Sequence, residues 1–485
     1  MRQYEKKQLI KMTELLDTVH VQIAQLYAQG NHENACEIMI QAIEVADTMR
    51  VTIENNQGKV DVASGILNYR TELLSLLEEI AETSGTEQEI SSADMQDRLW
   101  QLGQSLQVAA ERIKNDLPVR YEVVFLPYKV GMWDSLESIY LAAKEDPECD
   151  PYVVPIPYYD KNSDDSFGRL NYEGDRFPSD IPVMPFTRYN LEERHPDAIF
   201  IHNAYDDVSF VTSVKEEYYT KRLSQYTDCL VYVPYYVFMG GVPEWARDLP
   251  GYYNVDYIVT ESEEHSSQMD KFHKDKYLPF GSPKYDKVIN YRVREEDIPE
   301  EWKPKLYDKA VFMNASLTAV LTYGEAMLAK LRAAAKLFRM RGDITLLFRP
   351  HPLIESTLEM MRPELLHEYM DIVRMIEEMP CGIVDRTPIP ELAIALSNAY
   401  IGESKSSIPP LFRAAGKPIF YFNYDIETVI SDVNDYPYAE PKQRTFSSQE
   451  DTGSSPRIAQ GHMANADGRC GEKVYAFVKS HISLR

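Results

Sequence analysis

Two short runs in the C-terminal half of the chain carry residue types that bind phosphate. In the run ITLLFRPHP, Arg349 and His351 follow an apolar stretch typical of a buried strand, and the two prolines favour an extended backbone. Arginine presents a fork of donors to phosphate oxygens, and histidine donates a hydrogen bond or a proton. The alternative is that both side chains only cap the end of a strand.

The second run, AYIGESKSSIPPLFRAAGKPIFYF, predicts a strand, a polar turn, a short helix and another strand. Ser406 and Ser407 lie just before that helix, where hydroxyls, backbone N–H groups and the helix dipole favour an anion. Lys405 adds positive charge to the turn, which also contains Glu403. Because serine is a common helix N-cap, a structural role for one serine is the alternative. Together the two runs predict a site for the phosphates of a nucleotide-activated small molecule.

In the N-terminal half, His202 follows the apolar stretch of DAIFIHNAYDD and is a candidate acid or base. The alternative is a structural histidine that bonds to a neighbouring loop. Acidic pairs occur at Asp164-Asp165 and at Asp206-Asp207, but such pairs are common in solvated loops. A phosphate group held by arginine, histidine and a helix N-terminus does not require a metal ion, so we predict none.

From residue 117 onward, short β-branched or aromatic runs alternate with helical patterns, which is typical of parallel α/β sheets. The candidate strands are 122–126, 152–156, 198–202, 230–233, 257–260, 310–313, 345–348, 399–401 and 419–422. One intervening helix has a capped start at Asp134, and another runs through Leu328 and Phe338. We therefore predict an α/β fold class with two doubly wound Rossmann-like domains, whose ligands lie outside the carboxyl ends of the strands.

The first 116 residues have a different pattern. Apolar positions 9, 12, 16, 19, 23 and 26 fall on one stripe of a helix, and similar patterns run through 36–53, 66–80 and 99–113. We predict a helical hairpin or bundle over 1–116, one Rossmann-like domain over 117–290 and a second over 291–485, joined near 291–305. A coiled-coil homo-oligomer through the N-terminal helices is the alternative to packing within one chain.

Composition narrows the classes of partner. The 485 residues include 76 Asp and Glu against 51 Lys and Arg, with a formal net charge of -25. An acidic surface repels nucleic acid, so we predict no nucleic-acid partner. The five cysteines lie apart without CxxC spacing, which indicates reduced cytoplasmic thiols. We find neither a signal-peptide pattern nor the roughly 20 apolar residues that span a bilayer, and expect any membrane contact to be peripheral.

The two phosphate-binding runs resemble the CDP-glycerol glycerophosphotransferase family, which includes the teichoic-acid primases and polymerases of Gram-positive bacteria. Family members carry an Arg-x-His segment after one strand and an Asp-Tyr-Ser-Ser segment before a short helix that ends in Gly-Lys-Pro. The matching residues are Arg349, His351, Ser406, Ser407 and Gly416-Lys417-Pro418, and the turn 280–286 is similar to the family's interdomain Gly-x-Pro-x-x-Asp turn. The resemblance covers roughly residues 275–480.

This resemblance implies a GT-B-like fold with 117–290 as the acceptor domain and 291–485 as the donor-binding domain. It also implies a transferase that moves glycerol phosphate from CDP-glycerol to a hydroxyl of a teichoic-acid-type polymer or glycan and releases CMP. CDP-glycerol is a substrate, so no cofactor is implied. A polymer, glycan or lipid-linked acceptor implies that the protein acts at the inner face of the cell membrane.

The resemblance also implies roles for single residues. The donor phosphates are contacted by Arg349, His351, Ser406 and Ser407, in a turn that includes Lys405 and Glu403, while Gly281, Ser282 and Lys284 form the interdomain loop beside the donor. His351 or His202 handles the proton of the acceptor hydroxyl.

The chain departs from the family pattern on the acceptor side. Family members have a Trp-His-Gly segment whose histidine is a proposed base, whereas the stretch VYVPYYVFMGG has Tyr235 and Tyr236 and no histidine. The family's Asp-Tyr is replaced by the longer Glu403-Ser404-Lys405. Two other functions stay open: a GT-B glycosyltransferase that uses a nucleotide sugar, and a catalytically degenerate member that acts as a scaffold.

Overall fold

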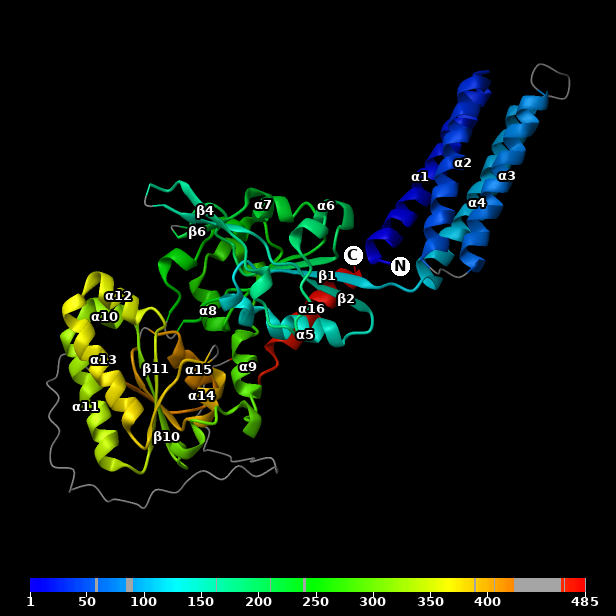
Figure 1. Ribbon diagram of the computed structural model, residues 1–485. Helices are drawn as coiled ribbons and strands as arrows, with labels where there is room; N and C mark the ends of the chain where they lie inside the picture. The colour runs from blue at the N-terminus through cyan, green and yellow to red at the C-terminus, as the bar shows by residue number, and fades with distance from the viewer. Residues whose placement is uncertain are drawn as a thin grey trace.

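The computed structural model describes the chain except for residues 57–59, 84–89, 163, 210, 239–240, 388–389, 405, 423–463, 466 and 485. Figure 1 shows a projecting helical bundle followed by two α/β units. We call these the first unit, whose sheet begins at residue 121, and the second unit, whose sheet begins at residue 310.

The bundle contains helices α1 (Gln3–Ala28), α2 (His32–Asn55), α3 (Val60–Thr83) and α4 (Ser92–Asp116). Each helix packs against the next in the chain, and α1 also packs against α4. Apolar side chains at helical spacing fill the core, which confirms the predicted helical region.

The first unit is built on a parallel sheet with the order β2-β1-β5-β7-β8-β9. The strands are β1 (Tyr121–Leu126), β2 (Cys149–Val153), β5 (Ala198–Ile201), β7 (Leu230–Tyr232), β8 (Tyr257–Val259) and β9 (Tyr277–Leu278). Helices α5 (Glu137–Glu145) and α16 (Cys470–Leu484) cover one face, and the other face packs with α6 (Leu191–Arg194) and α7 (Thr220–Leu223). Helix α8 (Glu263–Gln268) follows β8. The C-terminal helix therefore belongs to the core of the first unit.

A small antiparallel sheet with the order β4-β3-β6 belongs to the same part of the chain. Its strands are β3 (Tyr158–Lys161), β4 (Phe167–Asn171) and β6 (Thr212–Val214). We did not predict this sheet, because β4 is mostly exposed and lacks a run of buried apolar residues.

The second unit has a parallel sheet with the order β12-β11-β10-β13-β14. The strands are β10 (Ala310–Ala315), β11 (Thr345–Pro350), β12 (Gly382–Val384), β13 (Ala399–Gly402) and β14 (Ile419–Tyr421). One face packs against α10 (Leu317–Tyr323), α11 (Glu325–Arg341), α12 (Ile354–Met361) and α13 (Pro363–Glu378). The other face packs against α9 (Lys284–Asn290), α14 (Glu391–Leu396) and α15 (Ile408–Ala414).

These sheets confirm the predicted fold class, and every predicted strand occurs close to its expected position. In each sheet the winding reverses at the centre, between β1 and β5 and between β10 and β13. The expected helix start at Asp134 is wrong, because a 3-10 turn (Val130–Ser135) precedes α5. The charged stretch 291–305 is well packed, since Ile298 and Trp302 are buried in the core of the second unit. No helix in the part of the chain that the structure describes is long and apolar enough to cross a membrane.

Helix α9 joins the two units. Its Lys284 pairs with Asp134 at 2.8 Å and its Lys287 pairs with Glu137 at 2.9 Å, both in the first unit. Tyr285 on the same helix is buried in the core of the second unit. The helix therefore contributes to both sides of the junction.

The same helix also holds the C-terminal helix. Asp286 is buried and accepts hydrogen bonds from the N–H groups of Cys470 and Gly471, at 3.0 and 2.7 Å. Asn465 donates to the same carboxylate at 2.6 Å. The first turn of a helix leaves such N–H groups without partners of its own, so Asp286 caps α16 from a distant part of the chain.

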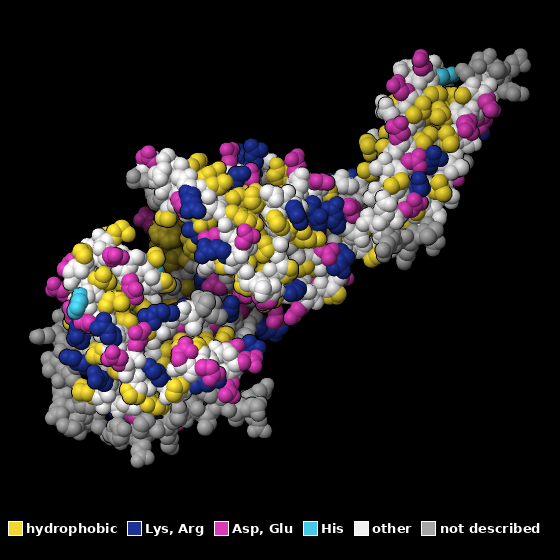
Figure 2. Space-filling view, in the orientation of Figure 1, with side chains coloured by type: hydrophobic (Ala, Val, Ile, Leu, Met, Phe, Trp, Pro, Cys, Tyr) yellow, Lys and Arg dark blue, Asp and Glu magenta, His cyan; other side chains and the backbone are white. Residues whose placement is uncertain are grey.

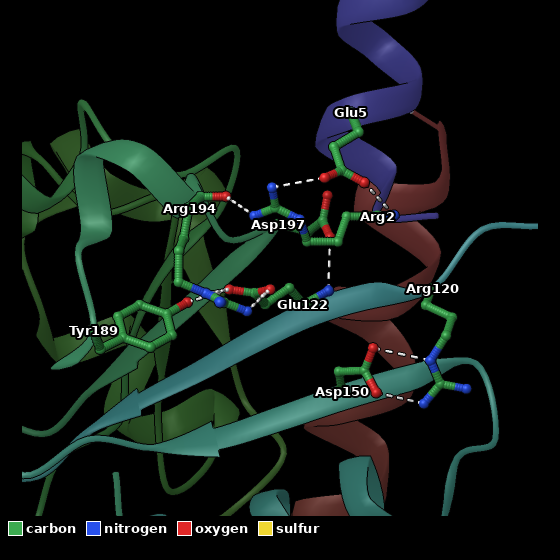
Figure 3. Close-up of polar contacts among 8 residues, drawn as sticks. All are labelled: Arg2, Glu5, Arg120, Glu122, Asp150, Tyr189, Arg194 and Asp197. Carbon is green, nitrogen blue, oxygen red and sulfur yellow. Dashed lines mark hydrogen bonds and ion pairs between the residues drawn. The ribbon is translucent and has the colours of Figure 1, made fainter. Parts of the chain in front are cut away.

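The bundle meets the first unit at the amino-terminal ends of β1 and β5, away from the edge where ligands are expected (Figure 3). Arg2 donates to the carbonyl of Arg194 at 2.9 Å. Beside this contact, Arg194 pairs with the buried Glu122, which also accepts a hydrogen bond from Tyr189. Asp197 in turn accepts the N–H of Glu122 at 2.8 Å.

We expect Asp286→Ala to destabilise the protein by about 2–4 kcal/mol, since each buried group left without a partner costs about 1–3 kcal/mol. Urea denaturation measures this loss. Glu472→Ala, on the exposed side of the same first turn, is the control. Equal stability of the two variants would contradict the capping role.

Asp197 gives a prediction on pH. Burial raises the pKa of Asp197 to about 7, above the value of about 3.9 for an unfolded chain. The folded state therefore binds this proton more tightly, and the free energy of unfolding falls as the pH rises from about 4 to about 7. We expect Asp197→Asn to gain stability relative to the wild type between about pH 5 and about pH 8. Urea denaturation at about pH 5 and about pH 8 measures the free energy of unfolding of both proteins, with Asp150→Asn as the control. The same gain in the control variant would contradict the prediction.

Candidate functional site

The predicted phosphate-binding residues converge on one edge of the second sheet. Strands β11 and β13 flank β10, so the residues after all of these strands meet at its carboxyl edge. The N–H of His351 donates to the carbonyl of Ala315 at the end of β10, at 2.9 Å, and Asn314 donates to the carbonyl of Arg349 at the same distance. This edge contains the point where the strand order reverses, the usual ligand position in an open α/β sheet.

His351 presents a donor at this edge. Its side chain is exposed, and its Nδ1 accepts the N–H of Leu353 at 3.2 Å. A neutral imidazole that accepts at Nδ1 carries its proton on Nε2, which is then the donor. Partial burial lowers the pKa of His351, which favours this neutral form. The geometry fits a hydrogen bond to a phosphate oxygen.

Arg349 is held by the neighbouring strand end. Its guanidinium pairs with the buried Asp385 at 2.6 Å and donates to the hydroxyl and the carbonyl of Thr387, at 3.1 and 2.9 Å. This is the strand-capping role that the sequence left open as the alternative. A role for Arg349 in binding a donor stays a prediction.

The turn before α15 offers hydroxyls rather than backbone donors. The Oγ of Ser406 accepts the N–H of Ile408 at 3.2 Å, and the exposed Ser407 makes no side-chain cap bond. Pro409 and Pro410 follow in the first turn and have no N–H. The free N–H groups that we expected at this helix start are therefore few, which weakens the backbone contribution to anion binding.

Other predicted residues of the donor side have structural surroundings. Glu403 is buried, and its carbonyl accepts the hydroxyl of Tyr400 at 2.8 Å. Lys405 lies outside the described residues. In the interdomain turn, Gly281 has a φ of 99°, and a Cβ there would lie 2.3 Å from the Cβ of Asn465. Ser282 is buried beside it.

His202 lies at the carboxyl end of β5 as expected, but it is fully buried. Its Nε2 accepts the N–H of Tyr128 at 3.1 Å, and its Nδ1 lies 3.3 Å from the carbonyl of Met132. Burial lowers the pKa of His202 to about 3. The ring is therefore neutral and ties the loop after β1 to β5, so the geometry favours the structural role over proton transfer.

Glu261 is a candidate that we did not predict. It follows β8, and its Oε1 accepts the N–H of Phe238 at 2.7 Å while its Oε2 accepts the hydroxyl of Tyr285 at 3.1 Å. His265 Nδ1 lies 3.7 Å from Oε1. Burial raises the pKa of Glu261 to about 7, near the value that suits a general base. The sequence signal was present, since Glu261 follows an apolar strand as His202 does.

Glu261 lines a mainly apolar pocket. The pocket lies at the carboxyl ends of β7 and β8 and is closed on one side by the turn at Ser282. Tyr236, Phe238 and Tyr252 provide aromatic walls. It thus combines the apolar lining and the few polar groups that are typical of small-molecule sites.

The pocket faces the second unit. Val237, between two of its wall residues, packs against the core of the second unit, and the charge of Arg413 on α15 acts on Glu261. Figure 2 shows a recess between the two units with hydrophobic side chains inside it. The carboxyl edges of the two sheets therefore face each other across the junction.

Two doubly wound sheets that face each other in this way define a GT-B-like fold. The chain matches no protein-family model and no curated protein. It is similar to a putative UDP-N-acetylglucosamine 2-epimerase from Listeria monocytogenes, with 14% identity over 76% of this chain and 98% of that chain and a TM-score of 0.48. It is also similar to MnaA of S. aureus, solved with UDP (11% identity, 75% and 98% coverage, TM-score 0.46). A third similar structure is the wall teichoic acid polymerase TagF (13% identity, 88% and 99% coverage, TM-score 0.42). At these scores, function has to be argued from the chain's own residues.

We expect His202→Ala to lower the free energy of unfolding by about 2–4 kcal/mol, because it removes a buried ring and leaves the N–H of Tyr128 without its acceptor. Urea denaturation measures the change, with His367→Ala as the exposed control. Unchanged stability combined with loss of activity would return His202 to the catalytic candidates.

Proposed function

We propose that the protein transfers glycerol phosphate from CDP-glycerol to a hydroxyl acceptor in the synthesis of a teichoic-acid-type polymer or glycan. The observation that supports this most is the convergence of Arg349, His351 and Ser406 on the carboxyl edge of the second sheet. That edge is the usual ligand position of the fold, and the first unit has a pocket at the carboxyl ends of β7 and β8.

In the proposed reaction, the acceptor oxygen forms a bond to the β-phosphorus of CDP-glycerol, and the bond between that phosphorus and the bridging oxygen breaks. CMP leaves with the electron pair, and the acceptor proton goes to a base. His351 Nε2–H and the hydroxyls of Ser406 and Ser407 hold the diphosphate oxygens, and Arg349 adds positive charge from beside Asp385. Positioning and charge stabilisation dominate such a step.

The acceptor in this proposal is a polymer, glycan or lipid-linked chain, and the protein works as a peripheral protein at the inner face of the membrane. A GT-B glycosyltransferase holds the diphosphate of a nucleotide sugar at the same edge. The donor is therefore tested directly, by measuring nucleotide release from CDP-glycerol and from UDP-, GDP- and CDP-sugars. Release from the sugars alone would overturn CDP-glycerol as the donor, and binding of none of them would favour the scaffold.

His351→Ala is the cleanest test of the proposed donor site at the carboxyl edge of the second sheet, because the side chain is exposed and its loss leaves the core intact. We expect donor affinity to fall about 10- to 150-fold, as removal of one hydrogen bond to a charged group costs about 1.5–3 kcal/mol. Calorimetric titration with CDP-glycerol measures this, with His367→Ala as the matched exposed control. Equal affinities for the two variants would place the donor elsewhere.

A further inference from the structure

The pocket around Glu261 has features of a site for the second substrate. It lies on the opposite side of the junction from His351 and opens at the carboxyl ends of β7 and β8. The proposed phosphate contacts of Arg349, His351 and the serines do not use this space, although the turn at Gly281 and Ser282 lines it.

The Glu261 carboxylate is fixed in position. Each of its oxygens accepts one hydrogen bond, from the Phe238 N–H and from the Tyr285 hydroxyl, and each keeps a further lone pair. Tyr236 and Tyr252 line the same pocket, and the charged groups of the described residues that act on Glu261 are His265 on α8 and Arg413 on α15. Both orient or stabilise a carboxylate, so the group is held ready to accept a proton.

The pocket lining indicates the chemistry of the ligand. Among the described residues that line it, none is a lysine or an arginine, so an anionic group would find no counter-charge from the lining itself. Tyr236 and Tyr252 offer flat apolar surfaces to a ring. The buried Ser282 Oγ has no hydrogen-bond partner among the described residues, although buried hydroxyls are normally paired. These features suit an uncharged ligand with hydroxyl groups, such as a sugar or a polyol.

We propose that this pocket binds the terminal sugar or polyol of the acceptor, and that Glu261 accepts the proton from its attacking hydroxyl. The inference rests on the proposed transferase function. The O–H bond of the acceptor breaks, its proton passes to a Glu261 oxygen, and the acceptor oxygen bonds to the reacting centre of the donor. The leaving nucleotide takes the electron pair of the broken bond, so the step is balanced.

Glu261 would thus supply the base that the stretch through Tyr235 and Tyr236 lacks. Glu261 accepts from a neutral amide and a neutral hydroxyl, and its carboxylate lines a pocket. Burial outweighs these two hydrogen bonds, which favour the charged form, and so raises the pKa of Glu261.

The first experiment uses the full-length Glu261→Gln variant. The glutamine keeps an acceptor for Phe238 and removes the charge, so folding should be preserved at about pH 8, which thermal unfolding checks. We expect kcat to fall about 100-fold or more, with donor affinity unchanged. The rise of kcat with pH near 7 in the wild type should disappear. Glu263→Gln, exposed on α8, is the control.

A kcat within threefold of the wild type, or an unchanged pH profile, would overturn the role of Glu261. A second measurement does not depend on the donor: saturation-transfer NMR with glycerol and glucose as probes. We expect the wild type to bind a probe and Tyr236→Ala to lose it. Absence of binding to the wild type would overturn the pocket assignment. If a probe binds but no nucleotide-activated donor does, the proposed transferase function fails, and with it the base role of Glu261, while the pocket assignment stands.

Discussion

The relation between the two sheets depends on one buried carboxylate. Asp286 lies on α9, which packs into the second unit, and it caps α16, which packs into the first. The C-terminal segment thus returns to the first unit, and the start of its helix α16 is fixed by Asp286, just after the interdomain turn. The same packing requires the glycine at position 281, because the close approach of Asn465 leaves no room for a side chain there. Asn290, which donates to the carbonyl of Gly468 at 2.7 Å, adds a second link between α9 and the entry to α16.

At the carboxyl edge of the second sheet, an ion pair limits how Arg349 can bind a phosphate. Arg349 and Asp385 are a partly buried pair, and breaking such a pair leaves a buried charge without compensation. A phosphate therefore has to join this pair rather than replace Asp385. The exposed His351 has no such constraint. Under the proposed function, His351 and the serine hydroxyls would therefore make the first contacts with the donor, and Arg349 would contribute positive charge from beside Asp385.

The sequence predicted the parallel sheets well because their buried strands form apolar runs. It missed the small sheet of β3, β4 and β6, whose strands are short or largely exposed, and β9, which has only two residues. The sequence identified the site residues that follow strands, but it did not indicate how deeply each side chain is buried. His202 and Glu261 both follow the carboxyl ends of strands, β5 and β8, yet His202 is sealed in the core and Glu261 lines a pocket. The burial of a side chain depends on loops from distant parts of the chain that pack over it. No local sequence pattern encodes this packing.

Glu261 also differs from His202 in what its burial does to stability. A buried histidine becomes neutral without losing its hydrogen bonds, and it strengthens the core at neutral pH. A carboxyl whose pKa is raised to about 7 opposes folding above that pH, because the folded state resists its ionisation. Replacement by glutamine would remove this penalty. A residue that is unfavourable for folding and lies in a pocket between two domains is therefore better explained by reactivity than by structure.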